Sequence, residues 1–270
     1  MRLINRKPGR TLAVFLALVP FVALVVAYTV ASEMRLAANP SDRLLPSLAT
    51  LGETAARLFT EGDRRTGEIL LWNDTWVSLA RLGAGVAIAA ATGLLAGLAV
   101  GLLPHARAAL GTFVAVVSMI PPLAILPILF IVFGLGETSK VALIVLGITP
   151  VLIRDMSQRV LDIPRELVVK AETLGASSLV IALRVALPQV MPRLVQSVRL
   201  SLGPAWLFLI AAEAIASEAG LGYRIFLVRR YLAMDVILTY VAWITLLAFL
   251  IDWALRALSR RLYPWAGGTL

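Results

Sequence analysis

Two carboxylates inside hydrophobic segments are the residues of this sequence best placed to do chemistry. Glu213 lies among alanines late in an apolar run, where an ionisable side chain is costly and therefore a candidate for function. The alternative is a position at the end of that run, one turn from Ser217 and Glu218. Asp252 has Arg256 four residues further on, a helical spacing that predicts a structural ion pair.

Residues for the common catalytic chemistries are missing. The sequence has no cysteine and a single histidine, His105, so thiolate, redox and zinc chemistry are not expected. The stretch Gly134–Lys140 lacks the spacing of a phosphate-binding loop, and neither H-E-x-x-H nor G-x-S-x-G occurs. We therefore predict no catalytic residue, no metal, no cofactor and no nucleotide bound by this chain.

The composition indicates a membrane protein. Of 270 residues, 60% are hydrophobic and 15% are charged, whereas about 25% of a soluble domain is charged. The formal charge is +9, and 22 of the 25 basic residues are arginine, which suits nucleic acid or anionic lipid. Because of the apolar excess, we expect membrane lipid as the partner and no binding of nucleic acid.

Six uncharged runs are candidates for membrane-spanning helices, because a bilayer core about 30 Å thick needs about 20 apolar residues. The first is longer than the apolar part of a secretory signal, so we expect an uncleaved span. The fourth is short, and Lys140 and Arg154 at its ends would have to extend to opposite interfaces. The runs are Thr11–Ala31, Leu82–Pro104, Ala108–Gly136, Val141–Ile153, Leu200–Ala212 continuing past Glu213, and Val236–Ile251.

The arginines of the short loops give these spans an orientation, because positive charge is retained in the cytoplasm. Both termini are then inside, although the basic loop with Arg224, Arg229 and Arg230 falls outside. The expected order is a cytoplasmic basic N-terminus at 1–10, a first transmembrane helix at 11–31, an extracytoplasmic segment at 32–80, a transmembrane core at 81–258 with a cytoplasmic loop at 155–193, and a cytoplasmic C-terminus at 259–270.

Small residues and prolines distinguish two of the spans. The second span carries a stripe of small residues at four-residue spacing, which favours tight helix packing within one subunit over a dimer interface. The third contains Ser118, Pro121 and Pro122, and its freed backbone carbonyls must face protein or a wet cavity. A kinked helix that lines a solute path and a kinked helix that only packs are both consistent with this pattern. The stripe is Gly85, Ala89, Gly93, Gly97 and Gly101.

The long cytoplasmic loop predicts two helices joined by a tight turn. Asp162–Pro164 offers an N-cap and a first-turn proline, and the helix Arg165–Thr173 should stop at Gly175. A second helix over Ser177–Leu187 should stop at Pro188. An apolar face on such a hairpin requires a partner to cover it. That face consists of Leu167, Val168, Ala171 and Leu174.

This loop resembles the EAA loop of ATP-binding-cassette (ABC) importer permeases, written E-A-A-x-x-x-G, nine residues, I-x-L-P. Nine residues separate Gly175 from Val185-Ala-Leu187-Pro188, so the spacing agrees. The EAA positions hold Val169-Lys170-Ala171, of which the last matches, and Glu166 and Glu172 lie nearby.

Other stretches narrow the resemblance. Ala171–Ser177 is similar to the version found in the nitrate, sulfonate, taurine and bicarbonate importer group, with further matches at Ala212-Glu213, Gly220–Tyr223 and Pro264-Trp265. Ser201–Trp206 and Phe226–Asp235 are similar to permeases associated with urea and guanidine metabolism.

The resemblance implies an all-α membrane protein with six transmembrane helices and a cytoplasmic coupling-helix loop, the architecture of a type I ABC importer permease. The implied function is a permease subunit that forms the translocation path for a small polar solute, nitrate-, sulfonate- or taurine-like or related to urea or guanidine. The chain would not be an enzyme, because a separate subunit hydrolyses ATP. The implied partners are that ATPase, a second permease copy in a homodimer, an extracytoplasmic substrate-binding protein and membrane lipid, in a bacterial inner membrane.

Two sets of site residues follow. The ATPase-coupling loop would use Ala171, Glu172, Leu174, Gly175, Ala176, Ser177, Leu187 and Pro188. The candidate translocation path consists of Ser118, Pro121, Pro122 and Glu213. The alternative function, a secondary transporter or channel for a small solute, would account for the spans and for Glu213, but it predicts inverted repeats and leaves the hairpin unexplained.

Overall fold

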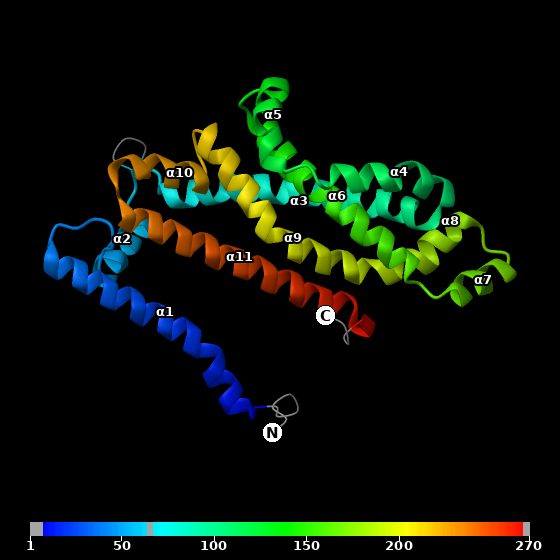
Figure 1. Ribbon diagram of the computed structural model, residues 1–270, viewed down its shortest axis with the longest axis horizontal. Helices are drawn as coiled ribbons and strands as arrows, with labels where there is room; N and C mark the ends of the chain where they lie inside the picture. The colour runs from blue at the N-terminus through cyan, green and yellow to red at the C-terminus, as the bar shows by residue number, and fades with distance from the viewer. Residues whose placement is uncertain (1–7, 64–66, 267–270) are drawn as a thin grey trace.

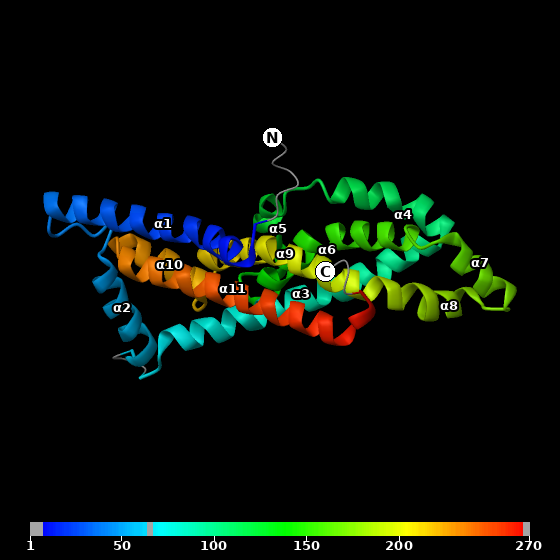
Figure 2. The same ribbon diagram turned by 90° about the horizontal axis from the view of Figure 1, so that it is seen from below.

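The protein is an elongated bundle of helices in a computed structural model that describes residues 8–63 and 67–266 (Figure 1). In both views α7 lies at one end of the long axis, and α2 and α10 lie near the other (Figure 2). Every regular element of the described residues is helical. The helices are α1 (Arg10–Ala38), α2 (Leu48–Thr60), α3 (Leu70–Leu102), α4 (Pro104–Val117), α5 (Leu126–Phe133), α6 (Glu137–Leu161), α7 (Arg165–Thr173), α8 (Ser178–Ile181), α9 (Leu187–Ile215), α10 (Leu221–Val228) and α11 (Met234–Leu262).

The tight packing predicted for the glycine stripe is confirmed within the chain. A Cβ at Gly85 would lie 2.8 Å from the Cβ of Ile144. A Cβ at Gly93 would lie 2.6 Å from the Cβ of Leu152. Only bare backbone lets α6 approach α3 this closely, so its side chains fill the face that the stripe leaves open. These side chains recur every four residues and form the buried core of the bundle: Ile144, Ile148, Leu152, Met156 and Val160.

Six spans result when one of them is counted as broken. Five described helices are long and apolar enough to cross a membrane, and α4 with the Pro122–Phe133 segment makes a sixth that is bent by 84°. The expectation of one kinked helix over Ala108–Gly136 was therefore wrong. Pro121 and Pro122 lack an N–H for the helical ladder, so the chain turns between two separate helices.

Two expected boundaries also differ. The second span begins at Leu70 rather than at Leu82, because the polar residues before the apolar run find partners inside the protein. The short fourth run lies within the 25-residue α6, which is long enough to cross a bilayer. Lys140 does not extend to an interface as expected: it is buried, and its Nζ donates to Glu137 over 3.1 Å.

Helix α1 runs beside the bundle and is joined to it near its end at α2 (Figure 1). Tyr28 and Ser32 donate hydrogen bonds to the Pro46 carbonyl (2.6 Å) and the Leu45 carbonyl (2.9 Å) in the connection to α2. The hydrogen bond from the Arg35 guanidinium holds the pKa of Asp42 in this connection below its usual range.

Helix α2 attaches the segment between α1 and α3 to the bundle, and Thr54 is its buried residue. Thr54 donates to Asp235 of α11 over 2.9 Å. Phe59 meets Trp72 and Trp243 edge to face, with ring centroids 5.8 and 5.0 Å apart. The expected cytoplasmic termini fall partly on residues 1–7 and 267–270, which lie outside the described residues.

Candidate functional site

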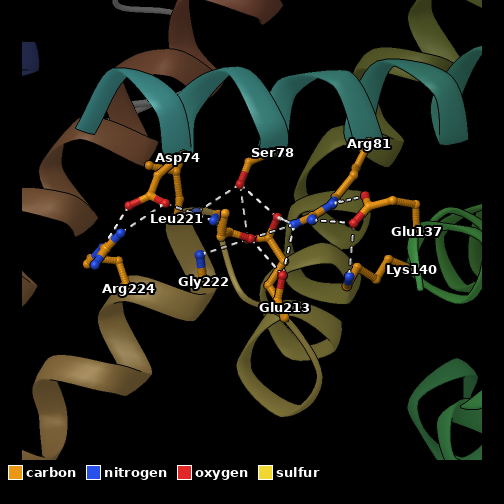
Figure 3. A network of polar contacts seen from close by, with 12 residues as sticks. Asp74, Ser78, Arg81, Glu137, Lys140, Glu213, Leu221, Gly222 and Arg224 are labelled. Atoms are coloured by element: carbon orange, nitrogen blue, oxygen red, sulfur yellow. Dashed lines mark hydrogen bonds and ion pairs between the residues drawn. The ribbon is translucent and has the colours of Figure 1, made fainter. Parts of the chain in front are cut away.

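A buried polar network occupies the end of the bundle where α3 begins (Figure 3). Asp74, Ser78 and Arg81 share one face of α3, because residues four and seven apart in a helix point the same way. The Ser78 hydroxyl donates to Glu213 Oε1 (2.7 Å) and accepts the backbone N–H of Leu221 (2.8 Å). The network thus joins α3 to the end of α9 and the start of α10.

Glu213 is completely enclosed by these partners. Its side chain is 0% exposed, and it accepts hydrogen bonds from Arg81 Nη1 (2.7 Å) and the Gly222 N–H (2.8 Å). A Cβ at Gly220, where φ is +127°, would lie 2.5 Å from Glu213 Oε1, so glycine is needed there on both grounds. Glu213 therefore lies inside the protein rather than at an exposed interface.

A second buried pair accounts for Arg224, one of the three arginines of the basic loop. Arg224 of α10 binds Asp74 of α3, with 2.8 Å between Nε and Oδ2, and Asp74 is 0% exposed. Asp74 also accepts the Gly220 N–H (2.9 Å) and contacts the Tyr240 hydroxyl (3.3 Å). Arg224 is thus a partner of a buried carboxylate and does not act as a free loop charge.

A cavity of about 980 Å³ opens beside this network. Arg81 lines this cavity. Its Nε and Nη2 groups, which are not bound to Glu213, form a bidentate pair with Glu137. Lys140 donates to the same carboxylate (Figure 3). The remaining wall combines apolar and polar groups from α3, α6, the end of α9 and the connections that precede α6 and follow α9: Trp76, Val77, Ala80, Leu135, Gly136, Val141, Ile215, Ala216, Ser217, Glu218 and Ala219.

The four residues predicted for the path do not come together around this cavity. Glu213 lies behind Arg81, and Ser118 caps α4, where Arg154 donates to its hydroxyl over 3.0 Å. Pro121 and Pro122 form the break between α4 and α5. Sequence reasoning missed Arg81, Glu137 and Lys140 as polar partners, although the spacing of Asp74, Ser78 and Arg81 signals one helix face.

The helix predicted at Arg165–Thr173 is confirmed as α7, and it protrudes at the opposite end of the molecule (Figure 1). It ends as expected at Gly175, where φ is +79°. The Ala176 N–H bonds the Ala171 carbonyl (3.0 Å) and the Gly175 N–H bonds the Glu172 carbonyl (2.9 Å), the pair of bonds that closes a helix on a left-handed glycine. Leu174 beside the turn is 80% exposed.

The prediction that the second helix of the loop stops at Pro188 was wrong. Ser177 caps α8, a π-turn follows at Ala182–Ala186, and α9 continues from Leu187 through Pro188. A proline in the first turn of a helix needs no donor, and the wider π-turn before it leaves room for the ring. The loop therefore passes directly into a membrane span.

The ion pair predicted within α11 is confirmed. Arg256 Nη2 lies 3.1 Å from Asp252 Oδ2. Arg199 of α9 also binds this carboxylate, with 2.7 Å between Nε and Oδ1. The carboxylate therefore links α11 to α9 as well as to its own next turn.

The fold and these features define a multi-span membrane protein with an exposed loop helix. Residues 89–263 match the family described as the binding-protein-dependent transport system inner membrane component, and the chain belongs to this family. It is similar to the taurine transport system permease protein TauC of Escherichia coli (strain K12), with 34% identity, over 91% of this chain and 87% of TauC. It is also similar to the nitrate import permease protein NrtB of Synechococcus elongatus, with 31% identity over 55% of this chain and 53% of NrtB.

A solved structure has the same fold. The inward-facing MetNI methionine ABC transporter superposes with a TM-score of 0.64 at 22% identity, over 71% of this chain and 95% of the matched chain. The type I ABC importer architecture is thereby confirmed. The chain is the permease subunit of an ABC importer in the inner membrane, and it acts with an ATPase subunit and a binding protein. It is a transport subunit rather than an enzyme, a secondary transporter or a channel.

Proposed function

We propose that this permease imports a small sulfonate or related oxyanion, and that two copies form the translocation path. The relatives named above transport taurine, which carries a sulfonate, and nitrate, rather than urea or guanidine. The observation that supports coupling to ATP is the exposed α7 and its glycine turn at one end of the bundle. The coupling residues are those from Ala171 to Ser177, together with Leu187 and Pro188, and α7 docks on the ATPase.

The proposed topology places the termini and α7 in the cytoplasm, and α2 and α10 outside. In intact cells with a permeabilised outer barrier, a cysteine at Ser41 should therefore react with a membrane-impermeant thiol reagent. A cysteine at Glu166, on α7, is the matched control and should react only after the inner membrane is opened. The natural sequence has no cysteine, so each label reports one position. The reverse labelling pattern would invert the topology.

Substitution of Gly175 tests the coupling role. Gly175→Val should reduce ATPase-dependent uptake at least about tenfold, because a side chain in the left-handed region costs about 1–2 kcal/mol, and a β-branched one is least tolerated there. A Cβ at this position would meet no atom within 4 Å, so the effect comes from the backbone and not from a clash.

Gly175→Asn is the control, because asparagine tolerates the left-handed conformation. It should retain most of the ATPase association in pull-downs and most of the uptake of taurine by the reconstituted transporter. Undiminished association and uptake in Gly175→Val would contradict the coupling role of this turn.

A further inference from the structure

The cavity beside the polar network contains a preformed cradle for an anion. Arg81 directs its Nε and Nη2 groups to the two oxygens of Glu137, with 2.6 Å between Nη2 and Oε1. Lys140 Nζ adds a third contact to Oε1 at 3.1 Å. A planar guanidinium fork binds carboxylates and other oxyanions through two parallel hydrogen bonds, and a nearby ammonium adds a further charged donor.

The two cations of this cradle and the carboxylate that they hold differ in how exposed their side chains are. The side chains of Arg81 and Lys140 are 6% and 4% exposed, whereas that of Glu137 is 63% exposed. Arg81 is held from behind by Glu213 and by the Ala219 carbonyl (2.8 Å). Glu137 is the first residue of α6 and its exposed side chain can rotate away, while Arg81 stays bound to Glu213 and Ala219.

We propose that Glu137 is a built-in substitute for the sulfonate group of the solute, which displaces it and binds between Arg81 and Lys140. This inference rests on the proposed function and assigns one site to it. The apolar part of the cavity wall, including Trp76 and Val141, suits the short carbon chain of an organic sulfonate. Glu213 balances one of the two buried cations, and Glu137 supplies the second negative charge when the site is empty, which avoids the cost of an uncompensated buried charge.

The return of Glu137 also weakens the hold on the solute. A transport site must bind well enough for entry and weakly enough for release. Competition by a tethered carboxylate reduces the apparent affinity and leaves the cradle ready for the next solute. The other acid on the wall, Glu218, is exposed and makes no part of the cradle.

Binding of methanesulfonate to the purified permease–ATPase complex in nanodiscs tests this site, without binding protein or nucleotide. Glu137→Gln should tighten binding about tenfold, the equivalent of about 1.4 kcal/mol. Glu137→Asp, which keeps the charge on a shorter side chain, should give a smaller gain and serves if the glutamine variant assembles poorly. Dimethyl sulfone has a similar shape but no charge. Neither Glu137 variant should bind it more tightly than the parent protein does.

Glu218→Gln is the matched control, because it removes the same charge from the same cavity wall. It should give little gain, and Lys140→Gln added to Glu137→Gln should abolish the gain. Equal gains from Glu137→Gln and Glu218→Gln, or none from either Glu137 variant, would overturn the proposal. If the transporter takes up taurine but neither Glu137 variant binds methanesulfonate more tightly, the proposed site is wrong and the proposed function stands. If the Glu137 variants bind methanesulfonate more tightly but the transporter takes up no sulfonate, the site is supported and the proposed solute is wrong.

Discussion

Replacement of Gly97 by leucine is expected to prevent accumulation of folded permease. A Cβ at Gly97 would contact the Cβ of Met156 and lie 3.2 Å from the Ile153 carbonyl oxygen, an atom of the α6 backbone. Because backbone cannot rotate aside, α3 and α6 must separate. We expect a loss of about 3 kcal/mol or more, the upper end of the range for overpacked interiors. The recovery of monodisperse protein in mild detergent measures the effect.

Gly83→Leu is the matched control on the same helix. Gly83 is exposed, and a Cβ there would meet no atom within 4 Å. This variant should be recovered like the parent protein. Equal recovery of Gly97→Leu and Gly83→Leu would show that the α3–α6 contact does not limit folding.

Removal of the Glu213 carboxylate should have the second large effect. Glu213→Ala removes the buried carboxylate that pairs with Arg81 and leaves Ser78 and the Gly222 N–H without their acceptor. Breaking a buried ion pair from one side costs about 3–5 kcal/mol. Glu213→Gln keeps an acceptor oxygen and should lose about 1–3 kcal/mol. Thermal unfolding of the purified complex measures both losses.

The comparison with an exposed acid separates this role from a simple change of charge. Glu218→Ala, five residues away along the chain, should unfold at nearly the parent temperature. Parent-like stability of Glu213→Ala would exclude the structural role. If Glu213→Gln assembles normally but changes the rate or selectivity of transport, Glu213 instead acts on the solute path, as the sequence first suggested.

Local patterns in the sequence predicted the features that depend on neighbouring residues. The four-residue spacing from Gly85 to Gly101 predicted the close helix contact, and Gly175 predicted the end of α7. A bare helix face and a positive φ are both set within one or two turns and can be read from the chain itself, whereas the helix that packs on the stripe, α6, could not be named from it.

Features that depend on distant residues were not predictable in this way. Arg81 was counted among the charges of an outer segment, whereas its carboxylate partners are 56 and 132 residues away. Lys140 was expected at an interface because a single run of sequence does not show which helices will surround it. The passage of the chain through Pro188 depended on a π-turn, which has no simple sequence signal.

The continuity of α8 and α9 has a mechanical consequence. From Ser178 to Ile215 the chain is one helix of 38 residues, which at 1.5 Å per residue is about 57 Å long. One end adjoins the α7 turn, and the other carries Glu213. A helix of this length is a lever arm: a tilt of about 10° at one end displaces the other by about 10 Å. A rotation applied at the α7 turn therefore reaches Glu213 through one helix, which can bend at the π-turn, at Pro192 and at Pro204.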